Sequence, residues 1–434
     1  MTVRDRASDL RGVATELWAG GRGPILVAVA GGWFLSIGVR MVYPAILPQL
    51  RGDFGFDLTT AGLLVTALWI AYAIGQLPGG ILDDRFGGRR VLVASTAVSA
   101  TALALVVTAG STVVLFAATV LFGLTTALYG VTRFTILSNN YADRAGTAIG
   151  VTMAAGDLGN ALLPPLGGAL AVAIAWEAGL GFAIPAFLAA AVGIFLVIPS
   201  DGRGESADGG SAEERRTPAD ERSADDDGEA GTESAPGIVS TARTLAGVIR
   251  RPSVLVVTAA QLLGYCVWQG LTAFYPTYLV EIKGIPQTTA TALFGLFFAL
   301  GIVSKLAAGS AYDAYGIRRS LPVALGFGAV GIGMLALVEG TLAVAGATVV
   351  ASGMLGYATI TLTELTAAFP ETVQGTGLGL LRTGYMGIGA GAPTVIGVLA
   401  DADHFTEAIL LLALVAGVAA LFALRIPGGT GDAS

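Results

Sequence analysis

Six charged side chains lie inside long apolar stretches of this sequence. They are Arg40, Arg133, Asp157, Lys305, Glu364 and Arg382. A charge at the centre of a membrane-spanning helix costs roughly 2.5–3.5 kcal/mol on insertion scales, so charges kept there mark substrate, ion or proton pathways. Side chains of this kind can bind an anion, pair with one another or take up a proton. No pattern of a nucleophile with a general base is visible, so the residues indicate binding and transport rather than an enzyme.

The composition places these charges in a membrane protein. Of the 434 residues, 54% are hydrophobic and 13% are charged, with a mean hydropathy of +0.74. A soluble protein carries roughly 25% charged residues. The single cysteine, Cys266, lies in an apolar stretch and excludes a disulfide framework or a cysteine-based metal site. We expect no metal, no cofactor and no nucleic-acid partner.

Twelve apolar stretches are long enough to cross a bilayer, which takes about 20 residues. Six of them precede a long polar segment and six follow it. They span residues 24–48, 58–82, 90–109, 111–138, 147–173, 179–198, 252–280, 288–311, 319–338, 341–369, 375–400 and 405–425. The sequence therefore predicts an all-α membrane protein with twelve transmembrane helices in two pseudo-symmetric six-helix bundles.

Basic residues predict the orientation of these spans. With the N-terminus inside, eighteen of the 24 Lys and Arg residues fall in internal segments and two, Arg51 and Lys283, in external loops. This positive-inside bias places both termini in the cytoplasm and the protein in the cytoplasmic membrane. The predicted units are an N-terminal tail, a first bundle, a linker, a second bundle and a C-terminal tail, at residues 1–23, 24–199, 200–240, 241–425 and 426–434.

The central linker, residues 200–240, is rich in Gly, Ser, Ala, Asp and Glu, and we expect it to be disordered. Between Asp201 and Glu233 it holds twelve acids and four arginines, a net charge of 4 − 12 = −8, against −7 for the whole chain. Strong negative charge is typical of proteins in a high-salt cytoplasm, where it keeps surfaces hydrated. An ordinary acidic linker from a GC-rich genome is the alternative interpretation.

A short polar signature occurs twice in the chain, at a spacing of 309 − 80 = 229 residues. Its shared positions are Gly80, Asp84, Gly87, Arg89 and Arg90 in the first copy and Gly309, Asp313, Gly316, Arg318 and Arg319 in the second. The same offset relates Gly146 to Gly375 and Pro164 to Pro393. Parallel repeats of six spans, related by an axis along the membrane normal, are a common plan of secondary transporters.

In this signature the chain resembles the major facilitator superfamily, whose loop between the second and third spans reads G-x-x-x-D-[RK]-x-G-[RK]-[RK]. Here Asp84 is followed by Arg85, and Gly88 replaces the usual basic residue after Gly87. In the second copy, Ala314 stands where a basic residue is usual. The resemblance covers nearly the whole chain and implies two bundles that rock about a substrate site near the midplane of the membrane.

The signature predicts two cytoplasmic latches between the halves. The positive end of a helix dipole attracts a carboxylate, so we expect Asp84 to face the start of the eleventh span near Gly375. The other expected contacts are Arg89 or Arg90 with Asp143, Asp313 with the start of the fifth span, and Arg318 or Arg319 with Glu371. The alternative is that these are ordinary positive charges of cytoplasmic loops.

The fifth span carries a second resemblance, to the G-x8-G-x3-G-P-x2-G-G signature of proton-coupled antiporters in this family. The corresponding residues are Gly150, Gly159, Leu163, Pro164, Gly167 and Gly168, with Leu163 in place of one glycine. A related signature of the fourth span has an Arg four residues before a Gly, and Thr119 occupies that position before Gly123. A proton-driven drug or metabolite exporter is therefore the alternative transport function.

Arg40 is the leading candidate for a substrate site. It lies about 16 residues into the first span, roughly mid-bilayer at 1.5 Å per residue, and its planar guanidinium suits a carboxylate or a phosphate. Its repeat equivalent is Gln269; because organophosphate antiporters of the family use Arg in both spans, the resemblance favours a carboxylate. An intramembrane ion pair is the alternative role. The other predicted substrate-binding residues are Tyr43, Gln261, Tyr265, Trp268, Arg382 and Tyr385.

The remaining intramembrane charges are predicted to couple or gate. Asp157 and Lys305 lie at similar depths of the fifth and eighth spans, which pack across the two halves in this family, so we expect them to pair. Asp157 is also the predicted proton-coupling residue. Arg133 and Glu364, near the inner ends of the fourth and tenth spans, would form an inner gate.

These observations predict a secondary active transporter that moves a small solute, in the first place an organic anion, by alternating access. Its expected partners are a small-molecule substrate, a coupling proton or cation, and the lipid bilayer, and we expect a monomer. Beside the exporter, a non-transporting membrane sensor on the same scaffold is the third alternative. A sensor would need a folded cytoplasmic effector, which a disordered linker does not supply.

Overall fold

Helices form the regular structure of the computed structural model, which describes residues 17–18, 21–199 and 238–426. The first group comprises α2 (Gly23–Arg40), α3 (Val42–Phe54), α4 (Leu58–Phe86), α5 (Gly88–Val107), α6 (Thr112–Asn140), α7 (Ala145–Ala173), α8 (Trp176–Gly181) and α9 (Ala183–Val197), with the short helix η2 (Ala142–Arg144). The second group comprises α10 (Ile238–Ile249), α11 (Pro252–Glu281), α12 (Gln287–Tyr315), α13 (Ile317–Leu337), α14 (Thr341–Ser352), α15 (Tyr357–Ala368), α16 (Glu371–Gly389), α17 (Ala392–Asp401) and α18 (Phe405–Ala423), with η4 (Gly353–Gly356). The predicted all-helical fold is confirmed.

Eleven helical segments of the described residues are long and apolar enough to cross a membrane. Four of them consist of two helices in series: α2 with α3, α8 with α9, α14 with α15, and α16 with α17. The 29-residue helix α7 is not among the eleven, because Asp157, Asn160 and two prolines lower its hydropathy. With α7 as the remaining crossing, the prediction of twelve spans is confirmed to within one helix.

Prolines explain two of the breaks between helices in series. Pro44 lacks the N–H that would donate to the carbonyl of Arg40 four residues earlier, so α2 ends at Arg40 and α3 starts at Val42. Pro393 stands in the same relation to Gly389, the last residue of α16. Each break lets one crossing change direction within the membrane, directly after residues predicted to bind substrate.

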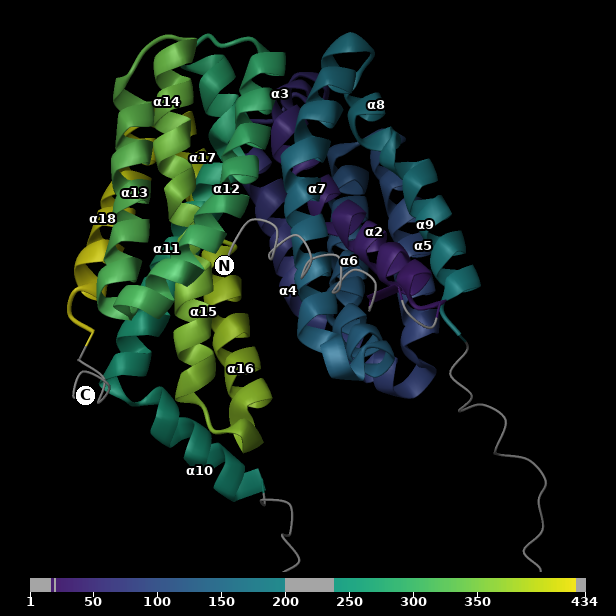
Figure 1. Cartoon of the computed structure of the whole chain (residues 1–434). Coiled ribbons are helices and arrows are strands. Elements are labelled where there is room, and N and C mark those ends of the chain that lie inside the picture. Colours follow the sequence, from purple (N-terminus) through teal and green to yellow (C-terminus); the bar gives the residue numbers. More distant parts are fainter. Residues whose placement is uncertain (1–16, 19–20, 200–237, 427–434) are drawn as a thin grey trace, which may run out of the picture.

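The two groups of helices lie side by side, the first in purple to blue and the second in green to yellow (Figure 1). They touch at the end of the molecule opposite α10, where α4 meets α17. A Cβ added at Gly62 of α4 would lie 2.4 Å from the carbonyl oxygen of Pro393. One added at Gly397 of α17 would lie 2.3 Å from that of Leu58. At the other end of α4, a Cβ added at Gly80 would meet nothing within 4 Å, so α4 has no such close neighbour at that position.

Gly331→Ala is expected to lower the melting temperature of the protein. A Cβ at Gly331 of α13 would lie 2.2 Å from the backbone nitrogen of Ala351 of α14. The two helices must separate to admit it, and overpacking of this kind costs about 1–3 kcal/mol. Gly326→Ala is the matched control on α13, because a Cβ there meets nothing within 4 Å. Thermal unfolding in detergent compares the two, and equal melting temperatures would contradict the packing described here.

Candidate functional site

The guanidinium of Arg40 is the centre of the candidate site. Arg40 is 1% exposed, and its Nε donates to the carbonyl oxygen of Ser36 at 3.0 Å. Its Nη1 and Nη2 are buried without a hydrogen-bond partner. Its Cζ lies 3.8 Å from the ring centre of Tyr72 and 5.0 Å from that of Trp69, both on α4. Aromatic faces attract a cation, but they leave the two terminal nitrogens free to donate to an anion.

A second arginine, Arg133 of α6, shares an aromatic neighbour with Arg40. The Cζ of Arg133 lies 3.4 Å from the ring centre of Trp33 on α2, and the Cζ of Arg40 lies 5.8 Å from the same ring. Arg133 donates to the carbonyl oxygen of Gly130, and its Nε is buried without a partner. In the part of the chain that the structure describes, no carboxylate pairs with either arginine. The site is therefore positive and suited to an anion.

Sequence reasoning did not include Trp33 among the site residues, although a signal was present. Trp33 precedes Arg40 by seven residues, which places both on one face of a helix. Trp69 and Tyr72 are three residues apart and likewise share one face of α4. What the spacing could not reveal is that both faces meet around the guanidinium of Arg40.

Aromatic rings of the second half close the other side of the site. Trp268 of α11 lies 5.4 Å from Trp69 between ring centres, which joins the two halves at this depth. Tyr265 stacks on Trp268 at 5.6 Å and meets Tyr385 of α16 edge-on at 5.4 Å. Three of the predicted substrate-binding residues, Tyr265, Trp268 and Tyr385, are thus brought together with the aromatic neighbours of Arg40.

The other predicted substrate-binding residues have different surroundings. Gln261 accepts a hydrogen bond from the hydroxyl of Thr361. Gln269 is 1% exposed, and neither its Oε1 nor its Nε2 has a partner. Arg382 is exposed on α16, three residues before Tyr385.

Tyr43 is not brought to Arg40 and its neighbours. It is fully buried in the core of the first half, where its ring stacks on Phe122 at 6.1 Å. Its hydroxyl accepts a hydrogen bond from Thr119 at 3.4 Å. Tyr43 belongs to α3, beyond the break at Met41, although only three residues separate it from Arg40.

Asp157 and Lys305 form an ion pair between the two halves. The Lys305 Nζ of α12 lies 2.6 Å from the Asp157 Oδ1 of α7, and the two side chains are 36% and 21% exposed. The predicted contact is present, and its role in coupling stays a prediction. Arg133 and Glu364 are not brought together, since Glu364 accepts a hydrogen bond from the Tyr312 hydroxyl at 2.8 Å.

The residues of the first signature copy do not contact the second half. Asp84, Arg85 and Arg90 are exposed at the end of α4 and the start of α5. Arg89 donates to the carbonyl oxygen of Phe195 at 2.6 Å and lies 4.4 Å from its ring centre, within the first half rather than beside Asp143.

The second copy repeats this arrangement. Asp313, Arg318 and Arg319 are exposed, and a Cβ added at Gly309 would meet nothing within 4 Å. The side chain of Glu371 lies outside the described residues. In both copies the recurring glycine joins two helices with a positive φ, +82° at Gly87 and +69° at Gly316, which explains why glycine stands there. Among the side chains that the structure describes, none of the predicted latch contacts is formed in this conformation.

The acidic linker predicted at residues 200–240 falls outside the described residues, apart from residues 238–240 at the start of α10. Its proposed relation to a high-salt cytoplasm therefore stays a prediction.

Comparisons with known proteins match most of the chain to one family. The sequence profile of the Major Facilitator Superfamily matches residues 28–393. Among solved structures, a bacterial homologue of the human lysosomal transporter Spinster, in an inward-facing conformation, has a TM-score of 0.77 at 16% identity. The similarity covers 94% of this chain and 97% of that chain, and at this identity it concerns the fold.

Two curated relatives match over short segments. A stretch of 47 residues is 45% identical to the probable galactarate/D-glucarate transporter GudP of Pseudomonas putida. Another of 62 residues is 42% identical to the probable anion transporter 6, chloroplastic, of Arabidopsis thaliana. The matches cover 11% and 14% of this chain and span only 10% and 12% of the relatives' own length.

A double-mutant cycle of Asp157→Asn and Lys305→Gln is expected to show a coupling of about 0.5–1 kcal/mol in the free energy of unfolding, since a partly exposed ion pair contributes little more. The control cycle combines Asp157→Asn with Lys283→Gln, which breaks the separate pair of Lys283 with Glu339. Its two effects should add. Unfolding in mixed micelles measures both cycles, and additivity in the first would argue against the ion pair.

Proposed function

Because this chain belongs to the Major Facilitator Superfamily, a family of secondary transporters rather than enzymes, we propose that it carries a small organic anion across the membrane by alternating access. One observation carries the anionic part of this proposal. The guanidinium of Arg40 is buried against aromatic rings of α2 and α4, and both of its terminal nitrogens lack a hydrogen-bond partner. Buried charged donors that lack a hydrogen-bond acceptor cost free energy. An anion that accepts from both nitrogens removes that cost.

The neighbours of Arg40 support an anion over a cation. Arg133 adds a second positive charge beside Trp33, and the described residues around them supply aromatic faces rather than carboxylates. A low-dielectric region lined by one sign of charge attracts the opposite sign. A cationic drug would meet repulsion from both arginines, which weighs against the exporter of apolar cations.

A carboxylate fits this site better than a dianionic phosphate. The position that repeats Arg40 in the second half is Gln269, an amide whose oxygen and nitrogen are buried without partners. An amide can donate to one oxygen and accept from a hydroxyl, but it adds no positive charge. The names of the relatives support an anionic substrate, since one is a probable galactarate/D-glucarate transporter and the other a probable anion transporter.

The proposed transport cycle starts from the conformation described here. With both termini in the cytoplasm, the joined ends of α4 and α17 face outward and the separated ends face the cytoplasm. The contacts of Trp69 with Trp268 and of Asp157 with Lys305 lie between these ends. Opening to the outside would require the contacts between the joined ends of α4 and α17 to break. The signature residues at the cytoplasmic end would then come together.

We also propose that Asp157 couples transport to a proton. Its partner Lys305 belongs to the other half, so the ion pair must adjust whenever α7 and α12 change their relative position. A carboxylate that loses a cationic partner accepts a proton more readily. A proton taken up there would let the halves move without leaving an unpaired charge in the membrane.

Arg40→Ala is expected to abolish transport and the stabilisation of the protein by anions. Removing one partner of a buried charged contact weakens binding roughly 30-fold or more. Arg425→Ala, which removes an exposed arginine after α18, is the matched control and should behave like the unchanged protein. A thermal-shift screen of mono- and dicarboxylates identifies the ligand, and uptake into proteoliposomes then measures transport. Retained anion stabilisation and uptake in Arg40→Ala would refute the assignment.

Asp157→Asn is expected to uncouple transport from the pH gradient while leaving counterflow of labelled substrate intact, because an amide cannot carry a proton but keeps the size of the side chain. Uptake into proteoliposomes with and without an imposed pH gradient measures the coupling. If the gradient still drives accumulation in Asp157→Asn to the same level, the proton is carried elsewhere.

A further inference from the structure

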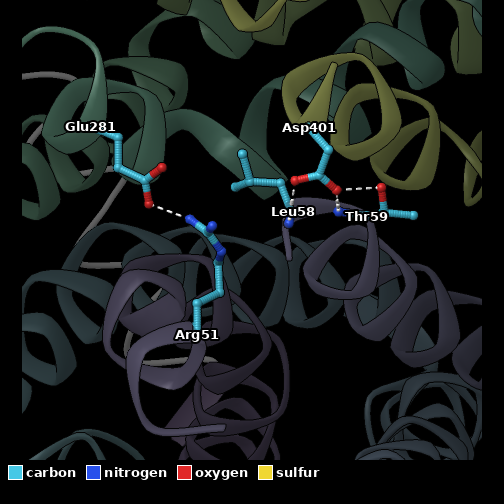
Figure 2. Close-up of polar contacts among 5 residues, drawn as sticks. All are labelled: Arg51, Leu58, Thr59, Glu281 and Asp401. Atoms are coloured by element: carbon cyan, nitrogen blue, oxygen red, sulfur yellow. Dashed lines mark hydrogen bonds and ion pairs between the residues drawn. The ribbon is translucent and has the colours of Figure 1, made fainter. Parts of the chain in front are cut away.

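We propose that Asp401, together with the ion pair of Arg51 and Glu281, forms a latch that holds the two halves closed at the end opposite the duplicated signature. We call these contacts the external latch, following the predicted orientation. Figure 2 shows both parts, with Arg51 and the start of α4 on the first half and Glu281 and Asp401 on the second. The inference concerns the conformational cycle and holds whatever substrate the protein carries.

Asp401 completes the hydrogen bonding at the start of α4. The first N–H groups of a helix have no acceptor within the helix. Asp401, the last residue of α17, accepts from the backbone nitrogen of Leu58 at 2.9 Å and of Thr59 at 2.6 Å, and also from the Thr59 hydroxyl. The next N–H, of Thr60, is taken by the α4 N-cap residue Asp57 at 2.8 Å. The cap of α4 is therefore supplied partly by its own half and partly by the other.

The charge of Asp401 adds to these hydrogen bonds. A helix start carries about half a positive charge, and a carboxylate there is stabilising. Hydrogen bonds from backbone amides to an ionised carboxylate are roughly twice as strong as neutral ones. Movement of α17 away from α4 would leave the Leu58 and Thr59 amides and the carboxylate to find other partners.

The second part of the latch lies at the ends of α3 and α11. Arg51 Nη1 donates to Glu281 Oε1, and the two side chains are 22% and 31% exposed. A partly exposed ion pair contributes modestly by itself. Together with the Asp401 cap, it gives the external end two polar cross-half contacts on neighbouring pairs of helices.

Close backbone packing ties the Asp401 cap to the position of the whole helix pair. Gly62 and Gly397 admit the facing helix so closely that a Cβ at either position would lie within 2.4 Å of a backbone oxygen. One turn deeper, the hydroxyls of Thr66 and Thr394 are 2.8 Å apart. The two crossings cannot separate at this end while the cap stays in place.

The external latch mirrors the predicted cytoplasmic one on the same pair of crossings. Asp401 ends α17 and caps the start of α4, whereas Asp84, near the end of α4, is predicted to cap the start of α16. Here the first cap is formed, and Asp84 is exposed. We infer that the two carboxylate caps alternate, so that the free energy lost when one opens is largely recovered when the other closes.

The latch is present on one side of the molecule only. The 229-residue offset places Val172 of α7 opposite Asp401 (401 − 229) and Val280 of α11 opposite Arg51 (51 + 229), so neither position carries the charge of its counterpart. At its external end the contact between α7 and α12 is formed by packing, with Thr291 against Gly168, whereas the ion pair of Asp157 with Lys305 lies deeper. The asymmetry matches the weaker second copy of the cytoplasmic signature and makes α4 with α17 the controlling pair.

The test measures the distance between the halves at the external end in purified protein without substrate. Nitroxide labels at Gly110→Cys and Thr341→Cys, in a Cys266→Ala background, lie at exposed external positions of the first and second halves. Asp401→Ala is expected to raise the ratio of long to short distances roughly 3- to 30-fold, the range of one charged helix cap. Thr59→Val, which removes one donor, should shift the same ratio less.

Asp403→Asn is the matched control. It removes an equal charge two residues after Asp401, from an exposed side chain that makes no cross-half contact. It should leave the distance distribution unchanged. An unchanged distribution in folded Asp401→Ala and in Thr59→Val would overturn the proposal, as would an equal shift in Asp403→Asn. Since no substrate is present, failure of the organic-anion assignment would not alter this result.

Discussion

A buried guanidinium without a carboxylate partner is the constraint around which this protein is built. Arg40 keeps its charge at the depth of the membrane interior with one backbone carbonyl and three aromatic rings as its contacts. Aromatic faces reduce the cost of burying a cation without neutralising it. The break after Arg40, where Pro44 lacks the N–H that would continue the helix, ends α2 at this depth, and Tyr43 of α3 lies in the core. The surrounding helices place aromatic and amide groups around Arg40. These groups do not neutralise the guanidinium, so its charge can bind an anionic ligand.

The contacts between the halves are graded along the membrane axis. Backbone packing and the Asp401 cap join one end, aromatic rings and the Asp157–Lys305 pair join the middle, and the charged signature residues Asp84 and Asp313 at the other end are exposed. A rigid half that rocks about the middle must exchange contacts at one end for contacts at the other. Helix starts suit this exchange, since each presents unsatisfied N–H groups that one carboxylate can satisfy or release. The crossing formed by α16 and α17 offers such a start at one end and such a carboxylate at the other.

Much of the fold was predictable because a bilayer allows few solutions. Every polar backbone group must be satisfied within a span, so apolar length alone predicts helices and their number. The pairing of Asp157 with Lys305 was predictable for a related reason, because depth in the membrane follows from counting residues along a straight helix. Arg133 shows the limit of this reasoning. Its depth was compatible with a gate to Glu364, but α6 is rotated so that its guanidinium lies over Trp33.

The sequence by itself determined the number of crossings, the repeat that relates the two halves, and the list of charges that cannot face lipid. These depend on length, offset and hydropathy, which are properties of the chain read along one dimension. Only the tertiary structure decided which charges meet, which remain without a partner, and which end of the molecule is joined. Those outcomes depend on the rotation of each helix about its axis and on breaks such as the one before Pro44. A rotation of a few tens of degrees exchanges one neighbour of a side chain for another and leaves the hydrophobic pattern unchanged. For this reason the sequence could not predict that Asp401 caps the start of α4.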